Sequence, residues 1–191
     1  ENAQLEAKAV AAIFDTEALL DTNATETTLQ RDGRDHQILH IAAHGRYDRF
    51  APLLSTLYLA KDGSNDGYLE AHEIYEMKIS AELVVLSACE TQVSDDLSKG
   101  DEITALNRAF LYAGADAVIA TLWQVDDVSS SLLMETFYEE LTNDNVDFAT
   151  ALQRAQAHVR ETYPHPYHWA GYVLTSNGTL TQNRSPWRIF D

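Results

Sequence analysis

The sequence has few basic residues. Lys and Arg number 13 against 30 Asp and Glu, which gives a formal charge of −17 at pH 7 over 191 residues. Proteins that bind DNA or RNA use Lys and Arg to neutralise phosphates, and no basic cluster occurs here. We therefore expect no nucleic-acid partner, and we attribute the acidic composition to solubility.

Cysteine and long apolar runs are also scarce. Cys89 is the only cysteine, so an internal disulfide is excluded and a cysteine-rich zinc site lacks its ligands. No run of about 18 apolar residues is long enough to span a membrane, and the first ten residues do not resemble a secretory signal. These absences predict a protein without a membrane partner in a reducing compartment, which we take to be the cytoplasm.

Two glycine motifs are missing as well. Neither Gly-x-Ser-x-Gly nor a phosphate-binding glycine loop occurs, so the sequence lacks the motifs typical of serine hydrolases and of nucleotide-binding proteins. We expect no cofactor. Hydrophobic residues still make up 45% of the chain, which is enough for a folded core. We interpret residues 1–191 as one domain, and because the first residue is Glu1 rather than Met, as part of a longer chain.

Apolar runs of strand length alternate with amphipathic stretches of helical length. This alternation predicts an open, mostly parallel sheet with helices on both faces, in which ligands bind beyond the carboxyl ends of the strands. A helix beginning near residue 24 would be capped by Thr22 or Asn23. The expected strands cover 37–42, 57–60, 67–69, 83–87, 117–122 and 172–175, and the expected helices cover 3–14, 24–30, 70–76, 103–112, 129–141 and 148–162.

A histidine and a cysteine follow two of the buried strands. His44 comes after the strand at 37–42, and Cys89 after the strand at 83–87. Each has an ordinary interpretation, a surface histidine and a small buried hydrophobe. Together they form a candidate Cys/His pair for nucleophilic catalysis. Gly45 strengthens it, because a residue without a side chain lets a backbone N–H approach a reacting carbonyl.

Three segments carry a family resemblance. They are Leu-His-Ile-Ala-Ala-His-Gly at 39–45, Leu-Val-Val-Leu-Ser-Ala-Cys-Glu-Thr at 83–91 and His-Pro-Tyr-His-Trp-Ala at 165–170. With matching pieces at 52–55, 106–114 and 121–127, the stretch from 17 to 176 resembles the CHAT family of caspase-like and separase-like cysteine peptidase domains. The resemblance implies a three-layer α/β/α caspase-like sandwich with a mostly parallel central sheet.

The resemblance also implies a chemistry. His44 would be the general base and Cys89 the nucleophile that forms a thioester, with the backbone N–H groups of Gly45 and Cys89 as the oxyanion hole. The activity would be that of a cysteine endopeptidase on protein or peptide substrates. Family members are often joined to tetratricopeptide repeats, so a repeat region or another activating partner is expected. The alternative is a catalytically inactive peptide-binding or regulatory domain of the same fold.

Substrate binding is assigned to four residues of the matching segments. Asp126 and Asp127 follow the strand at 117–122, and a carboxylate at the base of the first pocket would select Arg or Lys. The same pair fits the N-terminus of the next helix equally well, as a cap and as charges that favour the helix dipole. Some members of the family are expected to prefer an apolar residue instead. Glu90 and Trp123 complete the predicted substrate-binding set.

Two patterns suggest metals. Residues 62–73 match the spacing of an EF-hand calcium loop, but the incoming helix is missing because Pro52 and a strand-like stretch precede it. We favour a hairpin turn that leads into a short helix. His36, His40 and His44 are spaced by four, yet the His-Glu-x-x-His pattern is absent and the segment between them is strand-like. We predict no metal site.

Overall fold

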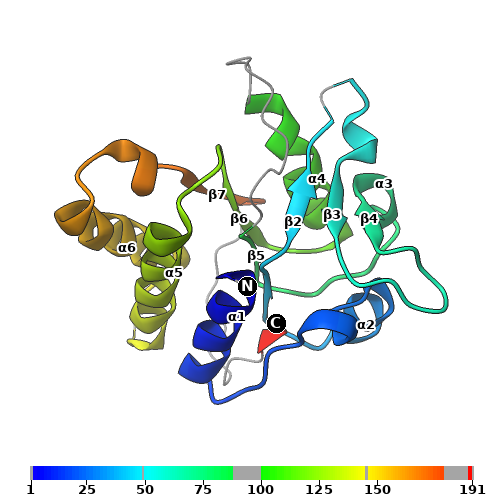
Figure 1. Ribbon diagram of the computed structural model, residues 1–191, viewed down its shortest axis with the longest axis horizontal. Coiled ribbons are helices and arrows are strands. Elements are labelled where there is room, and N and C mark those ends of the chain that lie inside the picture. The colour runs from blue at the N-terminus through cyan, green and yellow to red at the C-terminus, as the bar shows by residue number, and fades with distance from the viewer. Residues whose placement is uncertain (1, 49, 88–99, 145, 179–188, 191) are drawn as a thin grey trace.

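A five-stranded sheet forms the centre of the molecule (Figure 1). The computed structural model describes residues 2–48, 50–87, 100–144, 146–178 and 189–190. The strand order is β7-β6-β5-β1-β8. All neighbours are parallel except β6 and β7, so the predicted mostly parallel sheet is confirmed. The strands are β1 (Ile38–Ile41), β5 (Leu83–Leu86), β6 (Ala117–Thr121), β7 (Tyr172–Ser176) and β8 (Ile189–Phe190).

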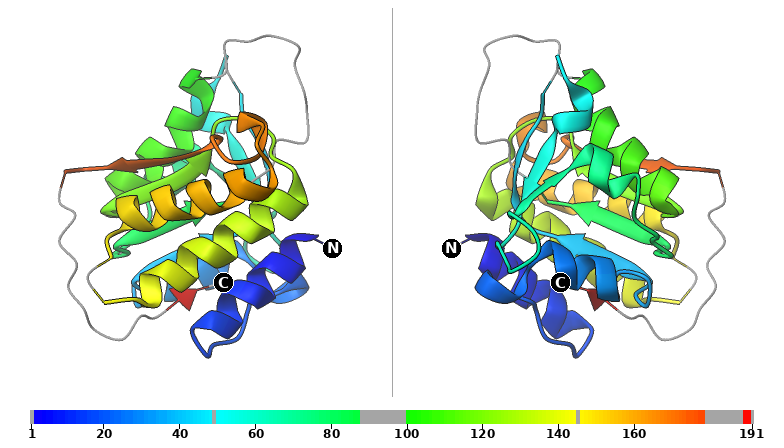
Figure 2. Two further views of the ribbon diagram at one scale, coloured as in Figure 1. Left: turned by 90° about the vertical axis from the view of Figure 1, so that its left-hand side faces the viewer. Right: turned by 90° about the vertical axis from the view of Figure 1, so that its right-hand side faces the viewer.

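Helices cover both faces of this sheet (Figure 2). On one face lie α1 (Asn2–Ile13), α5 (Asp127–Thr142) and α6 (Phe148–Thr162), and on the other α2 (Glu26–Asp32), α3 (Ala71–Ile74) and α4 (Gly100–Ala113). Each layer buries its own hydrophobic cluster against the sheet. The architecture is therefore the three-layer α/β/α sandwich that was predicted.

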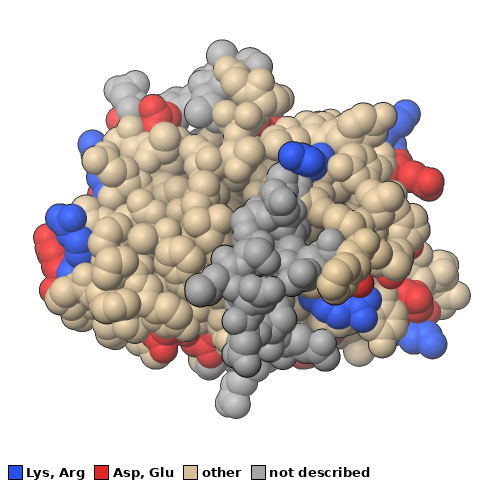
Figure 3. Space-filling view, turned by 90° about the horizontal axis from the view of Figure 1, so that it is seen from above, with Lys and Arg blue, Asp and Glu red and all other residues tan. Residues whose placement is uncertain are grey.

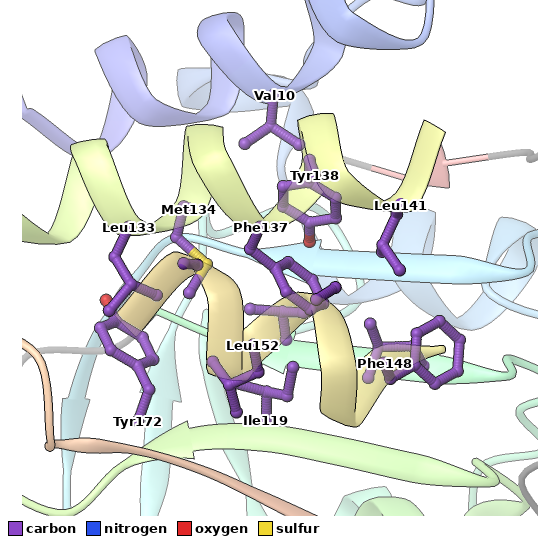
Figure 4. Close-up of a cluster of buried hydrophobic side chains, with 14 of the residues drawn as sticks. Val10, Ile119, Leu133, Met134, Phe137, Tyr138, Leu141, Phe148, Leu152 and Tyr172 are labelled. Atoms are coloured by element: carbon purple, nitrogen blue, oxygen red, sulfur yellow. The ribbon is translucent and has the colours of Figure 1, made fainter. Parts of the chain in front are cut away.

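The continuous apolar runs follow from this burial on both faces. In β1, Ile38 packs into the cluster under α5, whereas Leu39 and Ile41 pack into the cluster under α4. All four residues of β1 and of β5 are buried, as expected for inner strands of a parallel sheet. Figure 4 shows the cluster on the α5 side, where Phe137 and Tyr138 meet at a ring-centroid distance of 5.0 Å.

A second, three-stranded antiparallel sheet follows β1. It consists of β2 (His44–Arg46), β3 (Thr56–Tyr58) and β4 (Tyr68–Glu70). The predicted hairpin corresponds to β3 and β4, whereas β2 was not expected, because only one of its three residues is buried. The short 3-10 helices are η1 (Asp21–Asn23), η2 (Pro52–Leu54) and η3 (Pro166–His168).

Polar residues fix two of the helix starts. Thr25 caps α2, since its side chain accepts a hydrogen bond from the Thr28 N–H. The predicted caps, Thr22 and Asn23, are wrong because both belong to η1. Helix α5 begins two residues earlier than expected, because Asp126 is its N-cap.

Candidate functional site

His44 lies at the start of β2, where the chain leaves the carboxyl end of β1. The sequence placed His44 at the end of the first strand, but β1 ends at Ile41 and His44 opens a strand of the second sheet. Its side chain is exposed. It pairs across the ladder with Tyr58, which pairs in turn with Tyr68, and the two tyrosine rings meet edge to face at 5.6 Å. Because directly paired residues share a face, an accessible imidazole and two aromatic rings form one row.

Gly45 points away from this row. It is buried and pairs with Leu57, which pairs with Leu69 in β4, and both leucines are fully buried. Successive residues of a strand face opposite sides, so the packing of Gly45 fixes the outward direction of His44.

The carboxyl ends of β1 and β5 lie side by side. Ile41 pairs with Leu86, and the Ser87 N–H donates to the Ile41 carbonyl at 3.1 Å. His44 is three residues after Ile41, and Cys89 is three residues after Leu86. Two of the predicted site residues, Cys89 and Glu90, lie outside the residues that the structure describes. The described register thus brings together the two strands from which the predicted pair extends.

Hydroxyl groups tie the end of β5 to the neighbouring layer. The Ser87 Oγ lies 3.5 Å from the Tyr172 hydroxyl, which donates to the Ser130 Oγ of α5 at 3.1 Å. Tyr172 and Ser130 are buried, and hydrogen bonds between buried groups rigidify their surroundings. This series of hydroxyl contacts could not be predicted, because Ser87, Ser130 and Tyr172 are far apart in the sequence.

Asp126 caps α5. Its Oδ2 accepts from the Ser129 N–H at 3.0 Å, and the Ser129 hydroxyl donates back to the Asp126 carbonyl at 3.1 Å. The helix-cap interpretation is confirmed for Asp126. Asp127 is the exposed first residue of the helix, where a negative charge is favourable near the N–H groups of the first turn.

Trp123 is held by the loop that follows α6. Its indole N–H donates to the Tyr167 carbonyl at 3.0 Å, and a Cβ added at Gly171 would lie 3.1 Å from the indole. The same loop reaches α5, since the His168 Nδ1 lies 3.1 Å from the Ser129 Oγ. Trp123, Asp126 and Asp127 thus lie after the carboxyl end of β6, and the His-Pro-Tyr-His-Trp segment contacts Trp123 and Ser129 on either side of the two aspartates.

A cavity of about 320 Å³ opens beside His44. His44, Tyr58 and the end of β1 form one side of it, and the first half of α1 with residues 19–25 forms the other. Nothing in the sequence indicated this cavity, because its walls come from four separate segments. Its lining residues are Ala3, Gln4, Ala7, Leu19, Leu20, Asp21, Ala24, Thr25, Leu29, His40, Ile41, Ala42, Ala43, His44, Tyr58, Leu59 and Ala60.

His40 is buried where α1, β1 and α5 meet. Its Nδ1 lies 2.9 Å from the Tyr138 hydroxyl, and its Nε2 lies 3.0 Å from the Glu6 carboxylate. His36, by contrast, contacts the Asp32 carbonyl, and His44 lies in the other sheet. The three evenly spaced histidines therefore occupy separate surroundings. Among the described residues, no group of three His, Cys, Asp or Glu side chains is arranged to hold a metal ion.

Residues 62–73 form the turn of the β3–β4 hairpin and its exit into α3. Hydrogen bonds from the Thr27 hydroxyl and the Ser64 N–H hold the pKa of Asp62 well below its usual range. The Glu73 carboxylate, at the last ligand position of the calcium pattern, accepts from the Glu70 N–H at 2.8 Å and closes a capping box. The hairpin interpretation is confirmed, and these carboxylates have structural partners.

The upper face of the molecule carries few charges in its described part. Figure 3 shows this face from above, with Lys, Arg, Asp and Glu side chains mostly towards its margins. In Figure 1 the chain rises from β1 into β2 towards this face. In the described part of the chain, no helix combines the length and the apolar character needed to cross a membrane.

The family comparison decides the classification. The model of the CHAT domain matches residues 1–177. The chain belongs to the CHAT domain family. Tetratricopeptide repeat protein 28 from Mus musculus and from Homo sapiens is 34% identical over 108 residues, which is 56% of this chain and 4% of each relative. The chain thus spans a very small part of these relatives.

A solved structure supports the same fold. The Arg-specific cysteine proteinase gingipain R superposes with a TM-score of 0.66 over 92% of this chain and 42% of that chain, at 12% sequence identity. At this identity the likeness concerns the fold alone. The CHAT chain therefore has a caspase-like, cysteine peptidase-like α/β/α fold.

Proposed function

We propose that this CHAT domain is a cysteine endopeptidase with Cys89 as nucleophile and His44 as general base. The Cys89 Sγ attacks the carbonyl carbon of the scissile amide while His44 accepts the thiol proton. His44 then gives this proton to the leaving amine as the C–N bond breaks and a thioester remains. A water molecule, deprotonated by His44, attacks the thioester, and the carboxylate product leaves as the thiol is restored.

One observation carries the proposal: the register of β1 and β5. Ile41 and Leu86 are paired at the ends of neighbouring strands, and His44 and Cys89 each follow one of these two residues by three positions in the sequence. Ligands of open α/β sheets bind at this edge. The exposed side chain of His44 fits a base that must reach a substrate.

The proposal includes an oxyanion hole. The backbone N–H groups of Gly45 and Cys89 are the proposed donors, and the loss of one such donor typically costs about 3 kcal/mol of transition-state stabilisation. Support comes from the position of Gly45, directly after the proposed base.

Substrate selection is assigned to the carboxyl end of β6 and to Glu90. Asp126, Asp127 and Trp123 lie at that strand end, and negative charge there favours Arg or Lys before the scissile bond. Gingipain R is itself described as an Arg-specific proteinase, in line with this choice. A peptide library with basic, apolar and acidic residues at this position tests it, and a preference for Leu or Met over Arg would exclude the acidic pocket.

Two further assignments belong to the proposal. The name of the relatives, tetratricopeptide repeat protein 28, supports a tetratricopeptide-repeat region as the regulatory partner of this domain. We place its activity in the cytoplasm, in keeping with a single cysteine that must stay reduced.

The experiment combines labelling with cleavage. A peptide carrying an electrophile at its carboxyl end is expected to label Cys89, and Cys89→Ala abolishes both the adduct and the cleavage of a library peptide. His44→Ala is expected to lower kcat by at least about 100-fold, the usual contribution of a general base. His158→Ala is the matched control, since His158 is exposed on α6. If neither adduct nor cleavage occurs, also with a tetratricopeptide-repeat protein added, the regulatory-domain alternative is correct.

A further inference from the structure

We infer that the cavity beside His44 is a subsite for an apolar side chain of the substrate, in the half that leaves as the amine. This inference rests on the proposed function, because it needs a peptide bond that Cys89 and His44 cleave. It concerns the substrate residues after the bond, whereas the acidic pocket concerns those before it.

The composition of the cavity favours an apolar occupant. Eleven of its 17 lining residues are alanine, leucine or isoleucine. Asp21 is the only Asp, Glu, Lys or Arg among the described lining residues, and its carboxylate already accepts from the Gln4 amide. The Nδ1 of the buried His40 lies 2.9 Å from the Tyr138 hydroxyl, and its Nε2 lies 3.0 Å from the Glu6 carboxylate. A basic side chain would therefore be desolvated with little compensation, whereas an apolar one would be favourably buried.

The volume fits part of a peptide. At about 320 Å³, the cavity lies at the lower end of the range of small-molecule sites, roughly 300–1,000 Å³. It therefore has room for a large side chain such as Leu, Met or Phe. His44 itself lines the cavity, so a peptide that reaches the imidazole is already at its entrance.

The chemistry assigns the cavity to the leaving half of the substrate. His44 delivers the proton to the leaving amine, so the first residue after the scissile bond passes close to the imidazole. The cavity is bordered by the last residues of β1, whereas Asp126 and Asp127 follow β6, and β5 lies between these strands. Two strand spacings amount to about 10 Å, or about three residues of an extended peptide. The two regions are thus separate subsites.

The test uses internally quenched peptides on the unmodified chain. The sequence before the scissile bond is held constant, and the first two residues after it are varied among Ala, Leu, Phe, Lys and Glu. We expect kcat/KM to be at least about tenfold higher with Leu or Phe than with Ala at one of these positions, and lowest with Lys or Glu. Equal values for all five residues would overturn the subsite.

A filled cavity provides the second measurement. Ala3 lies on the α1 wall of the cavity, and Ala12 is exposed further along the same helix. Ala3→Leu is expected to lower kcat/KM for the Leu or Phe peptide by about tenfold and to leave the Ala peptide nearly unchanged, whereas Ala12→Leu affects neither. An equal loss for both peptides in Ala3→Leu would contradict the assignment.

Labelling of Cys89 separates this inference from the proposed function. A peptide electrophile that ends at the scissile position carries no residue for the cavity. Its labelling rate is therefore expected to be the same in Ala3→Leu and in the unmodified chain. Labelling and cleavage without any preference after the bond would refute the subsite alone. The absence of both labelling and cleavage would refute the proposed peptidase and the subsite with it.

Discussion

Asp126 is the first residue to test, because its carboxylate caps α5 and is also proposed to select a basic substrate residue. As the N-cap of α5, its carboxylate satisfies the Ser129 N–H, and Ser129 is fully buried. Replacing an N-cap Asp by Ala costs about 1 kcal/mol, within a range of about 0.5–2 kcal/mol. Asn keeps an oxygen that can accept the same hydrogen bond. Asp126→Asn therefore loses only the interaction of the charge with the helix dipole, about 0.3–1 kcal/mol.

The assay is urea unfolding of the two variants and the unmodified chain. In a chain of this size, 1 kcal/mol corresponds to a shift of about 2–4 °C in Tm, so thermal unfolding checks the same values independently. We expect the order of stability to be unmodified chain, Asp126→Asn, then Asp126→Ala. Equal stability of the Ala variant and the unmodified chain would refute the cap as the role of this carboxylate.

A cleavage assay on the same proteins separates the second role. If the charge of Asp126 also selects a basic residue, Asp126→Asn lowers kcat/KM for an Arg peptide while the protein remains folded. Asp147→Asn is the matched control, because Asp147 caps α6 in the same way, through the Thr150 N–H at 2.7 Å. A loss of Arg cleavage shared by both Asn variants would show that helix capping, rather than charge at the site, is responsible.

Two further predictions concern stability. Gly114→Ala is expected to lower the free energy of unfolding by about 1–3 kcal/mol, because φ is +119° and the added Cβ would lie 2.1 Å from the Ile79 carbonyl oxygen. Gly63→Ala, with open space around the added Cβ, is the control in urea unfolding. Equal destabilisation by the two substitutions would contradict this prediction. Burial, followed by repulsion from Glu73, raises the pKa of Glu26, so its native state binds protons more strongly and stability falls as pH rises through the interval above 4.5. Glu26→Gln is therefore expected to flatten this fall in unfolding curves taken between pH 4 and 7, and an unchanged slope would refute the assignment.

The inner strands could be predicted because burial on both faces leaves a plain signal. Residues 38–41 and 83–86 are apolar apart from His40, and each became a buried strand. The strand β2 left no such signal, since Gly45 is its only buried residue. The third strand of the small sheet therefore depends on pairing with the hairpin, which is information that residues 44–46 do not carry.

In the candidate site too, features with a local sequence signal could be predicted, and features that depend on distant partners could not. The sequence indicated the end of β1, three residues before His44, and the cap at Asp126, because both are local features. It missed the cavity and the bond from Trp123 to the Tyr167 carbonyl, since partners 44 residues apart are joined only by the fold. For Cys89 and Glu90 the sequence assignments stay predictions.

The pairing of β1 with β5 also limits how these strands can shift. A slip by one residue would exchange the two sides of β1, moving Leu39 to the α5 layer and His40 into the apolar layer beneath α4. A slip by two would restore the sides but leave the end of one strand about 7 Å ahead of the other. The hydrophobic layers on the two faces of the sheet thus determine how the carboxyl ends of β1 and β5 are aligned along the strand direction.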